Sequence, residues 1–144
     1  MNSTDPYNLQ RFVDAQESTF EQALDELRRG RKETHWMWFI FPQLAALGRS
    51  STAQYYGIHS LDEARAYMDH PVLGPRLARS VEVLLPWGGR RDAEQIFGPV
   101  DAMKLRSSLT LFGLASSQPT FGRALDAFFK APDERTLALV RGEG

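Results

Sequence analysis

The sequence predicts an all-α fold, a single compact domain over residues 1–144 built from about seven to eight short helices. Apolar residues recur at three- and four-residue steps along most of the chain, as they do on amphipathic helices. No segment shows sustained alternation of apolar and polar residues joined by hairpin turn signals, which disfavours a sheet. Proline, glycine and capping residues punctuate the chain at short intervals, and no internal repeat or long linker divides it.

The first helix is predicted over residues 7–29, which carry apolar side chains at helical spacing. These are Leu9, Phe12, Val13, Phe20, Ala23, Leu24 and Leu27. Gly30 supplies a helix stop. The basic residues on either side of it favour the negative end of the helix dipole, so we interpret them as a solvated helix terminus rather than a phosphate-binding patch. They are Arg28, Arg29, Arg31 and Lys32.

Later helices begin at caps or prolines. Ser60 and Glu63 have the spacing of a capping box for a helix over residues 61–69, and Asp92 and Gln95 repeat it before a short helix that Gly98 closes. The other predicted helices span residues 72–85, 99–114, 119–130 and 132–140. Residues 48–57 are typical of a cap followed by one helical turn, or alternatively of a polar loop at the mouth of a pocket.

Residues 34–43, Thr-His-Trp-Met-Trp-Phe-Ile-Phe-Pro-Gln, are the densest aromatic cluster of the sequence. Periodicity does not separate helix from strand here, but the helical neighbours and the threonine at the start favour a helix. In one interpretation these side chains are simply core. In the other, Trp36 or Trp38 forms the wall of a pocket for a flat ligand, and His35 presents at its edge an imidazole that titrates near neutral pH.

The helix after Pro99 has two apolar faces instead of one. One face carries Ala102, Leu105, Leu109 and Phe112, and the other carries Val100, Met103 and Leu111. Two polar stripes run between them, one of Asp101, Lys104 and Ser108 and the other of Arg106 and Thr110. We expect neighbours on both sides of this helix and at least one partly enclosed stripe. Either Asp101 and Lys104 pair with each other, or Lys104 or Arg106 faces a cavity and meets an anionic ligand.

The composition is that of a globular protein, with 42% hydrophobic and 11% aromatic residues. The formal net charge of −1 disfavours general nucleic-acid binding, because no positive field concentrates a polyanion around the chain. The N-terminus lacks the features of a signal peptide, and no apolar stretch reaches the roughly 18 residues of a membrane span. We therefore expect a cytoplasmic protein that does not enter membranes.

Metal and nucleophile motifs are missing from the sequence. The absence of cysteine excludes disulfides, thiolate metal sites and a cysteine nucleophile. The three histidines form no HExxH motif or close pair, and no GxSxG nucleophile elbow is present. We predict no metal and no cofactor.

Several segments together resemble one family over nearly the whole chain. They are residues 5–16, 30–44, 61–67, 70–74 and 96–112, the second reading Gly-Arg-Lys-Glu-Thr-His-Trp-Met-Trp-Phe-Ile-Phe-Pro-Gln-Leu. The sequence resembles the DUF1810 family, whose members are uncharacterised and are sometimes labelled calpastatin-like. The resemblance implies no mechanism. A compact globular sequence does not support a protease-inhibitor role, since calpastatin inhibits as a long disordered chain.

Two hypotheses for function follow. The first is a small-molecule or nucleotide-type pocket, which could be enzymatic, between residues 34–43 and the helix after Pro99. Its candidate catalytic residues are Asp101 and His35, and its candidate ligand-binding residues are Trp36, Trp38, Lys104, Arg106 and Ser108. The predicted partner is a small anionic or nucleotide-like ligand. One concrete chemistry is cleavage of a glycosidic bond, with Asp101 stabilising oxocarbenium charge. The alternative is a non-catalytic protein-interaction module or homodimer formed by exposed aromatics.

Overall fold

The computed structural model describes residues 5–142 and confirms the all-α class. The helices are α1 (Gln10–Glu17), α2 (Phe20–Arg28), α3 (Met37–Ile40), α4 (Ser51–Tyr55), α5 (Leu61–Asp69), α6 (Leu73–Leu84), α7 (Ala93–Phe97), α8 (Pro99–Ala115), α9 (Thr120–Phe128) and α10 (Glu134–Gly142). Two 3-10 turns, η1 (Ala45–Leu47) and η2 (Leu85–Trp87), join them. Within the described residues there are ten α-helices, of which seven have at least eight residues, and α3, α4 and α7 are single turns.

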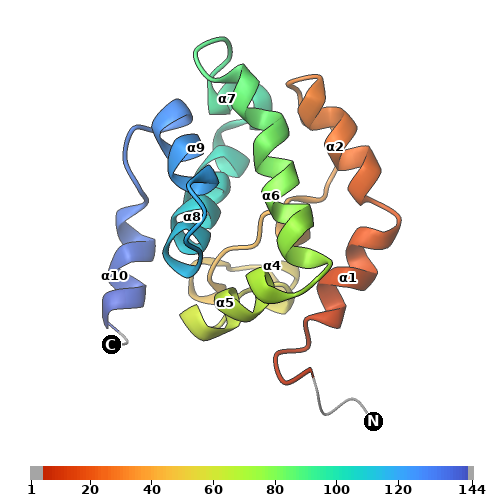
Figure 1. The fold of residues 1–144 in the computed structure, drawn as a ribbon, viewed down its shortest axis with the longest axis vertical. Helices are drawn as coiled ribbons and strands as arrows, with labels where there is room; N and C mark the ends of the chain where they lie inside the picture. Colours follow the sequence, from red (N-terminus) through yellow and green to blue (C-terminus); the bar gives the residue numbers. More distant parts are fainter. Residues whose placement is uncertain (1–4, 143–144) are drawn as a thin grey trace.

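Helix α8 is the centre of the fold. It packs against α5, α7, α9 and α10, while α6 packs against α2, α5 and α9. In Figure 1, α1 and α2 lie on one side of the molecule and α9 and α10 on the other, with α6 and α8 between them. The apolar face of α8 predicted from Ala102, Leu105, Leu109 and Phe112 is buried in the single hydrophobic core.

The single long helix predicted over residues 7–29 is wrong, because the chain forms two helices separated at Ser18 and Thr19. Thr19 adopts φ −121°, outside the helical range. Serine and threonine are also weak helix formers in the interior of a helix. The break turns Gln16 into the core, where its side-chain amide donates to the Phe39 carbonyl at 2.7 Å and to the Tyr67 hydroxyl at 3.1 Å. The apolar pattern continues across the break, which is why periodicity does not reveal it.

The first helix also starts later than predicted. Asp5 accepts the backbone N–H groups of Leu9 and Gln10, so the carboxylate closes the start of α1, and Asn8 adopts φ +52° just before it. At the other end, Gly30 takes φ +70° and ends α2 as predicted.

The two predicted capping boxes differ in outcome. Asp92 and Gln95 form both hydrogen bonds of the box at the start of α7. Ser60 caps α5 through the Glu63 N–H, but the Glu63 carboxylate does not complete the box. Its Oε1 accepts the His59 N–H at 3.0 Å, and its Oε2 pairs with the Arg11 guanidinium at 2.9 Å. Arg11 and Glu63 are both buried, and this ion pair joins α1 to α5.

An isolated bridge fixes the loop that carries α4. Leu44 and Ile58 pair in parallel, with Ile58 N–H donating to the Gln43 carbonyl at 2.9 Å and Ala45 N–H to the Ile58 carbonyl at 2.8 Å. Between the two paired segments, Ser50 caps one helical turn, as one of the two interpretations of residues 48–57 predicted. The bridge therefore brings both ends of this loop against the aromatic segment.

Candidate functional site

A buried carboxylate organises the turn that leads into the aromatic segment. Glu26 is fully buried, and its Oε1 accepts the N–H groups of Glu33 and Thr34 at 2.7 and 3.0 Å and the Trp36 indole N–H at 2.9 Å. Its Oε2 accepts from the Thr34 hydroxyl at 2.6 Å and from the Gln22 amide at 2.8 Å. Burial alone would raise the Glu26 pKa, but these hydrogen bonds outweigh it and lower the pKa from 4.5 to about 2. The ionised carboxylate therefore holds residues 33–36 in place.

The aromatic segment forms one helical turn, α3, and divides between core and surface. Trp36, Met37, Ile40 and Phe41 are buried in the core. Trp38 and Phe39 are half-buried, and His35 is exposed. Of the two predicted tryptophans, only Trp38 therefore keeps a face that a ligand could reach.

Two lysine–tryptophan pairs flank one carboxylate. The Lys32 ammonium lies 3.0 Å from Asp101 Oδ2 and 5.0 Å from the Trp36 ring centroid. The Lys104 ammonium lies 3.7 Å from Asp101 Oδ1 and 5.3 Å from the Trp38 ring centroid. Both geometries are within range of a cation–π interaction. Through Lys32, Asp101 thus connects the loop after α2 to the start of α8.

The interpretation of the basic run as a solvated helix terminus is wrong for Lys32. Its side chain is only 8% exposed, and its ammonium donates to the Thr34 carbonyl at 2.6 Å besides pairing with Asp101. The backbone N–H of Lys32 donates to the Ile96 carbonyl, which fixes this residue beside α7. Arg28 and Arg31 are exposed, and Arg29 pairs with two surface carboxylates.

The stripe of Asp101, Lys104 and Ser108 runs from the surface into the core. The side chains of Asp101 and Lys104 are 21% and 24% exposed, whereas Ser108 is 1% exposed. The Ser108 hydroxyl has no hydrogen-bond partner among the described residues. A buried polar group of this kind is unusual, because leaving it unpaired costs free energy.

The other polar stripe of α8, formed by Arg106 and Thr110, contacts the segment before α10. The Arg106 guanidinium donates to the carbonyls of Ala131 and Pro132, and the Thr110 hydroxyl accepts the Asp133 N–H. These contacts hold the start of α10 against α8. The structure therefore does not bring Arg106 to the aromatic segment.

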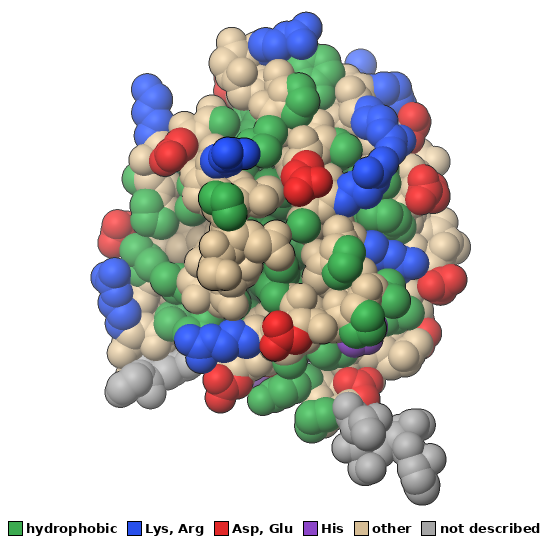
Figure 2. All heavy atoms as spheres, in the orientation of Figure 1, with side chains coloured by type: hydrophobic (Ala, Val, Ile, Leu, Met, Phe, Trp, Pro, Cys, Tyr) green, Lys and Arg blue, Asp and Glu red, His purple; other side chains and the backbone are tan. Residues whose placement is uncertain are grey.

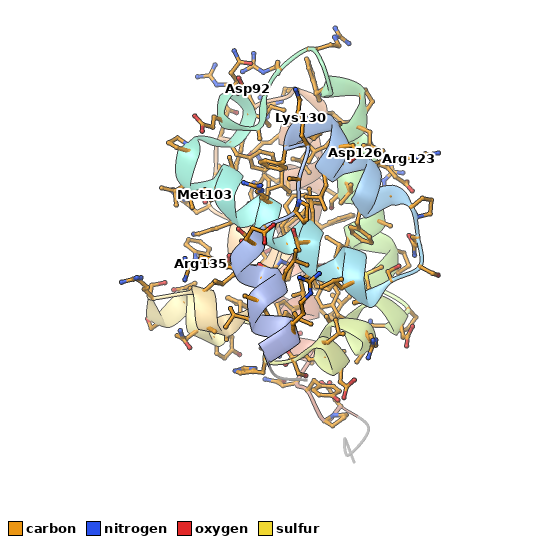
Figure 3. All side chains as sticks on the ribbon, turned by 90° about the vertical axis from the view of Figure 1, so that its left-hand side faces the viewer. Asp92, Met103, Arg123, Asp126, Lys130 and Arg135 are labelled. Carbon is orange, nitrogen blue, oxygen red and sulfur yellow. The ribbon has the colours of Figure 1, made fainter. Side chains whose placement is uncertain are left out.

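The prediction that both apolar faces of α8 are packed is wrong for one of them. Val100 and Met103 are 65% and 68% exposed, although Leu111 on the same face is buried. Met103 lies on the outer side of α8 in Figure 3. The helix is covered on both sides only beyond its first two turns, because α10 reaches only its later part.

A small cavity of about 10 Å³ lies between Trp38 and Lys104. It is lined by Met37, Trp38, Phe41, Gln43, Ala53, Tyr56 and Lys104. This volume is about that of one water molecule. Gln43 adds a side-chain amide and Tyr56 a phenol, whose pKa is raised by burial. We call these lining residues the Trp38–Lys104 site.

The outer wall of this cavity is the least buried helix of the fold. Ala53 of α4 and Tyr56 just after it close the cavity, and no residue of α4 is buried. The Gln54 amide ties α4 to the carbonyls of Ala45 and Gly48 at 3.0 and 2.6 Å. The Tyr56 ring packs against Phe12 and Phe39, with ring centroids 5.9 and 5.3 Å apart, and so belongs to the edge of the core. The α4 side of the wall, with Ala53, is held by hydrogen bonds at the surface, so its displacement exposes little apolar area.

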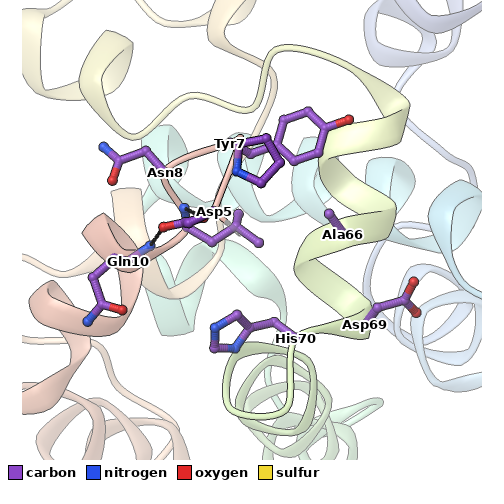
Figure 4. A pocket seen from close by; sticks show the side chains of 9 residues that line it. Asp5, Tyr7, Asn8, Gln10, Ala66, Asp69 and His70 are labelled. Carbon is purple, nitrogen blue, oxygen red and sulfur yellow. Dashed lines mark hydrogen bonds between the residues drawn. The ribbon is translucent and has the colours of Figure 1, made fainter. Parts of the chain in front are cut away.

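A larger hollow lies elsewhere, beside the start of α1, and has a volume of about 890 Å³ (Figure 4). Two of its polar side chains, Asp5 and His70, already accept hydrogen bonds from backbone N–H groups. Asp5 closes the start of α1, and the His70 Nδ1 accepts two N–H groups at the start of α6, at 3.1 and 3.3 Å. A third hollow of about 290 Å³ lies between Arg91 and Phe128. The hollow beside α1 is lined by no lysine or arginine among the described residues, whereas the third is lined by Arg90, Arg91 and Phe128. The Trp38–Lys104 site differs from both because it joins the aromatic segment, residues 34–43, to α8.

Charges on the molecular surface are mixed. Figure 2 shows acidic and basic side chains interspersed across one face, in keeping with the formal net charge of −1. Among residues 5–142, no group of three or more His, Asp or Glu side chains is arranged to hold a metal ion. No helix within the same residues is long and apolar enough to cross a membrane.

Sequence reasoning missed three residues of this region as site components. Lys32 is predicted as part of a solvated helix terminus, and its partner Asp101 lies far away in the sequence, so local spacing contains no signal for this contact. Gln43 ends the aromatic segment, and Tyr56 lies in residues 48–57, for which a polar loop at a pocket mouth is one of the two interpretations. These two positions are the signals that indicate them.

The structure thus defines an all-α domain in which a lysine of the central helix, Lys104, lies over a tryptophan ring, Trp38. The chain belongs to DUF1810, described as a protein family of unknown function, whose model matches residues 6–140. It is similar to a solved structure, the conserved hypothetical protein Rv1873 from Mycobacterium tuberculosis, at 47% identity. That match covers 95% of this chain and 99% of the other, with a TM-score of 0.92. A comparison with curated proteins found no match.

Proposed function

We propose that the Trp38–Lys104 site binds a small anionic molecule with a flat ring, with the ring against Trp38 and the negative charge at Lys104. The observation that carries this proposal is the position of the Lys104 ammonium, 5.3 Å from the Trp38 ring centroid and at the edge of a cavity. Its distance of 3.7 Å from Asp101 is longer than a hydrogen bond, so the ammonium keeps donors for a ligand.

Binding requires the cavity to enlarge. A volume of about 10 Å³ admits no ring, whereas ligand pockets typically have about 300 Å³ or more. The part of the wall formed by α4, with Ala53, can give way, because α4 has no buried residue to withdraw from the core. A ligand would then take the place of Ala53 against Trp38, and Tyr56 would stay at its edge.

Of the two predicted catalytic residues, Asp101 is the one that would act on a bound ligand if the protein is an enzyme. Asp101 lies beside Lys104, and its carboxylate could stabilise positive charge that develops on a sugar ring during cleavage of a glycosidic bond. His35 is exposed on the turn that precedes α3 and does not line the cavity. Ligand binding comes first in this proposal, and catalysis depends on it.

The experiment is a thermal-shift screen followed by calorimetry, with benzoate, nicotinate and adenosine monophosphate as probes. A ligand at 100 times its Kd stabilises the folded state by about 2.7 kcal/mol, which raises the Tm of a domain of this size by roughly 5–10 °C. Lys104→Ala and Trp38→Ala should abolish the shift. Lys130→Ala is the matched control, because Lys130 is an exposed lysine at the end of α9 that does not line the cavity (Figure 3). A shift that survives Lys104→Ala places binding elsewhere, and no shift with any probe counts against the proposal.

A protein-interaction role is the second candidate, and the exposure of Val100 and Met103 is the observation that favours it. These side chains stand one turn apart on α8 and form a small apolar patch beside Lys104. Light scattering across a concentration series tests self-association. A dimer in the unmodified protein that becomes a monomer in Met103→Asp would favour this role, and a monomer at all concentrations would oppose a homodimer.

A further inference from the structure

We infer that the ligand of the Trp38–Lys104 site carries a single negative charge, as a carboxylate, and that phosphate dianions are disfavoured there. This inference rests on the proposed function and names the chemical class of the ligand. It follows from the charges around the site, the availability of each cation and the polarity of the cavity wall.

Only one of the two ammonium groups is available. Lys32 is 8% exposed and is already occupied by Asp101 at 3.0 Å, by the Thr34 carbonyl at 2.6 Å and by the Trp36 ring. Lys104 is 24% exposed and more loosely paired. A ligand anion would therefore take Lys104, and Asp101 would stay with Lys32.

The charges of the cluster match one added negative charge. Two ammonium groups and one carboxylate leave a single net positive charge over Lys32, Lys104 and Asp101. Because Asp101 lies 3.7 Å from the same ammonium, any anion bound to Lys104 also lies close to the Asp101 carboxylate. A dianion meets twice the repulsion of a monoanion from that carboxylate.

The cavity wall supports the same conclusion. Met37, Phe41 and Ala53 are apolar, and removing a dianion from water against such a wall costs more than removing a monoanion. The remaining polar groups, the Gln43 amide and the Tyr56 phenol, are uncharged donors. A carboxylate has two oxygens, of which one can accept from Lys104 and the other from one of these neutral donors.

The experiment compares head groups on one ring. Benzoate, phenyl phosphate and benzamide share the same ring and differ in charge, and their Kd values are measured by calorimetry at pH 8, where a phosphate monoester is a dianion with a second pKa near 6. We expect benzoate to bind at least about tenfold more tightly than phenyl phosphate, because the first negative charge already balances the cluster and the second leaves water without a cation to balance it. Benzamide should bind more weakly than benzoate.

Two measurements identify the cause. Asp101→Asn removes the repelling charge, so the preference for benzoate over phenyl phosphate should shrink severalfold, whereas Lys130→Ala should leave it unchanged. In the unmodified protein, the same preference should shrink at pH 5, where phenyl phosphate is a monoanion. The pH comparison needs no variant, so it remains decisive if Asp101→Asn does not fold.

Each contrary result has a distinct meaning. Phenyl phosphate binding as tightly as benzoate at pH 8 overturns the charge inference and leaves the binding site standing. The charge inference is also overturned if the preference for benzoate, measured at pH 5 and in Asp101→Asn, equals that of the unmodified protein at pH 8, since Asp101 would then not be its cause. If none of the three compounds binds, the proposed function fails and this inference fails with it.

Discussion

Glu26→Gln tests the carboxylate on which the geometry of the aromatic segment depends. The substitution keeps the shape of the side chain but removes its charge. Glu26 is fully buried and accepts five hydrogen bonds, including those from Glu33 N–H, Thr34 N–H and the Trp36 indole. A glutamine oxygen can still accept some of them, so the principal loss is the strength that the negative charge adds.

The magnitude follows from the pKa. A carboxyl group whose pKa falls from 4.5 in the unfolded chain to about 2 in the folded protein stabilises the fold by about 3 kcal/mol at neutral pH. Because the folded pKa is the lower one, this stabilisation is complete above about pH 4.5 and is lost as the pH falls toward 2. We therefore expect Glu26→Gln to lower the free energy of unfolding by about 3 kcal/mol at pH 7 and by much less near pH 2.

The assay is urea unfolding followed by circular dichroism, repeated at several pH values between 7 and 2. Glu82→Gln is the matched control, because Glu82 is an exposed carboxylate on α6, and it should change the free energy of unfolding by less than about 0.5 kcal/mol. A loss below about 1 kcal/mol at pH 7 would refute the reasoning. A loss that stays constant from pH 7 to pH 2.5 would also refute it, since the effect would then not depend on the charge.

Three further substitutions test the packing of the fold. Arg11→Met leaves Glu63 buried without its cation, so we expect a loss of about 3–5 kcal/mol in urea unfolding. An effect below about 1 kcal/mol would show that the pair is not desolvated. Gly74→Ala places a methyl group against the Met68 carbonyl and should destabilise the fold by about 1–3 kcal/mol. Gly113→Ala, where the added methyl finds ordinary contact inside α8, should stabilise it by about 0.5–1 kcal/mol. Equal effects of the two alanines would contradict the steric argument.

The elements that the sequence predicts well are those with strong local signals. The helix ended by Gly98 and the helix begun by Pro99 appear at the predicted positions, because caps and prolines act within one turn of the chain. The break at Ser18 and Thr19 has no such signal. It is set by the burial of Gln16 against residues far away in sequence, which no local pattern contains.

The candidate site divides in the same way. The proximity of Asp101 and Lys104 was predictable because both stand on one helix, three residues apart. The contact of Asp101 with Lys32 was not, because it joins the start of α8 to the loop after α2. The exposure of Val100 and Met103 could not be predicted from the sequence either, because helical periodicity shows that a face is apolar but not whether a neighbour covers it.

These contacts form one chain of dependence. Glu26 fixes the turn of residues 33–36, and that turn supplies the Thr34 carbonyl and the Trp36 ring that hold the Lys32 ammonium. Lys32 in turn holds Asp101, and because Asp101 is held from that side, Lys104 is left loosely paired over Trp38. In the proposed site, a buried carboxylate that does not line the cavity would thereby determine which cation is free to bind the ligand. If this order is right, Glu26→Gln should weaken benzoate binding as well as the fold, even under conditions where the variant is fully folded.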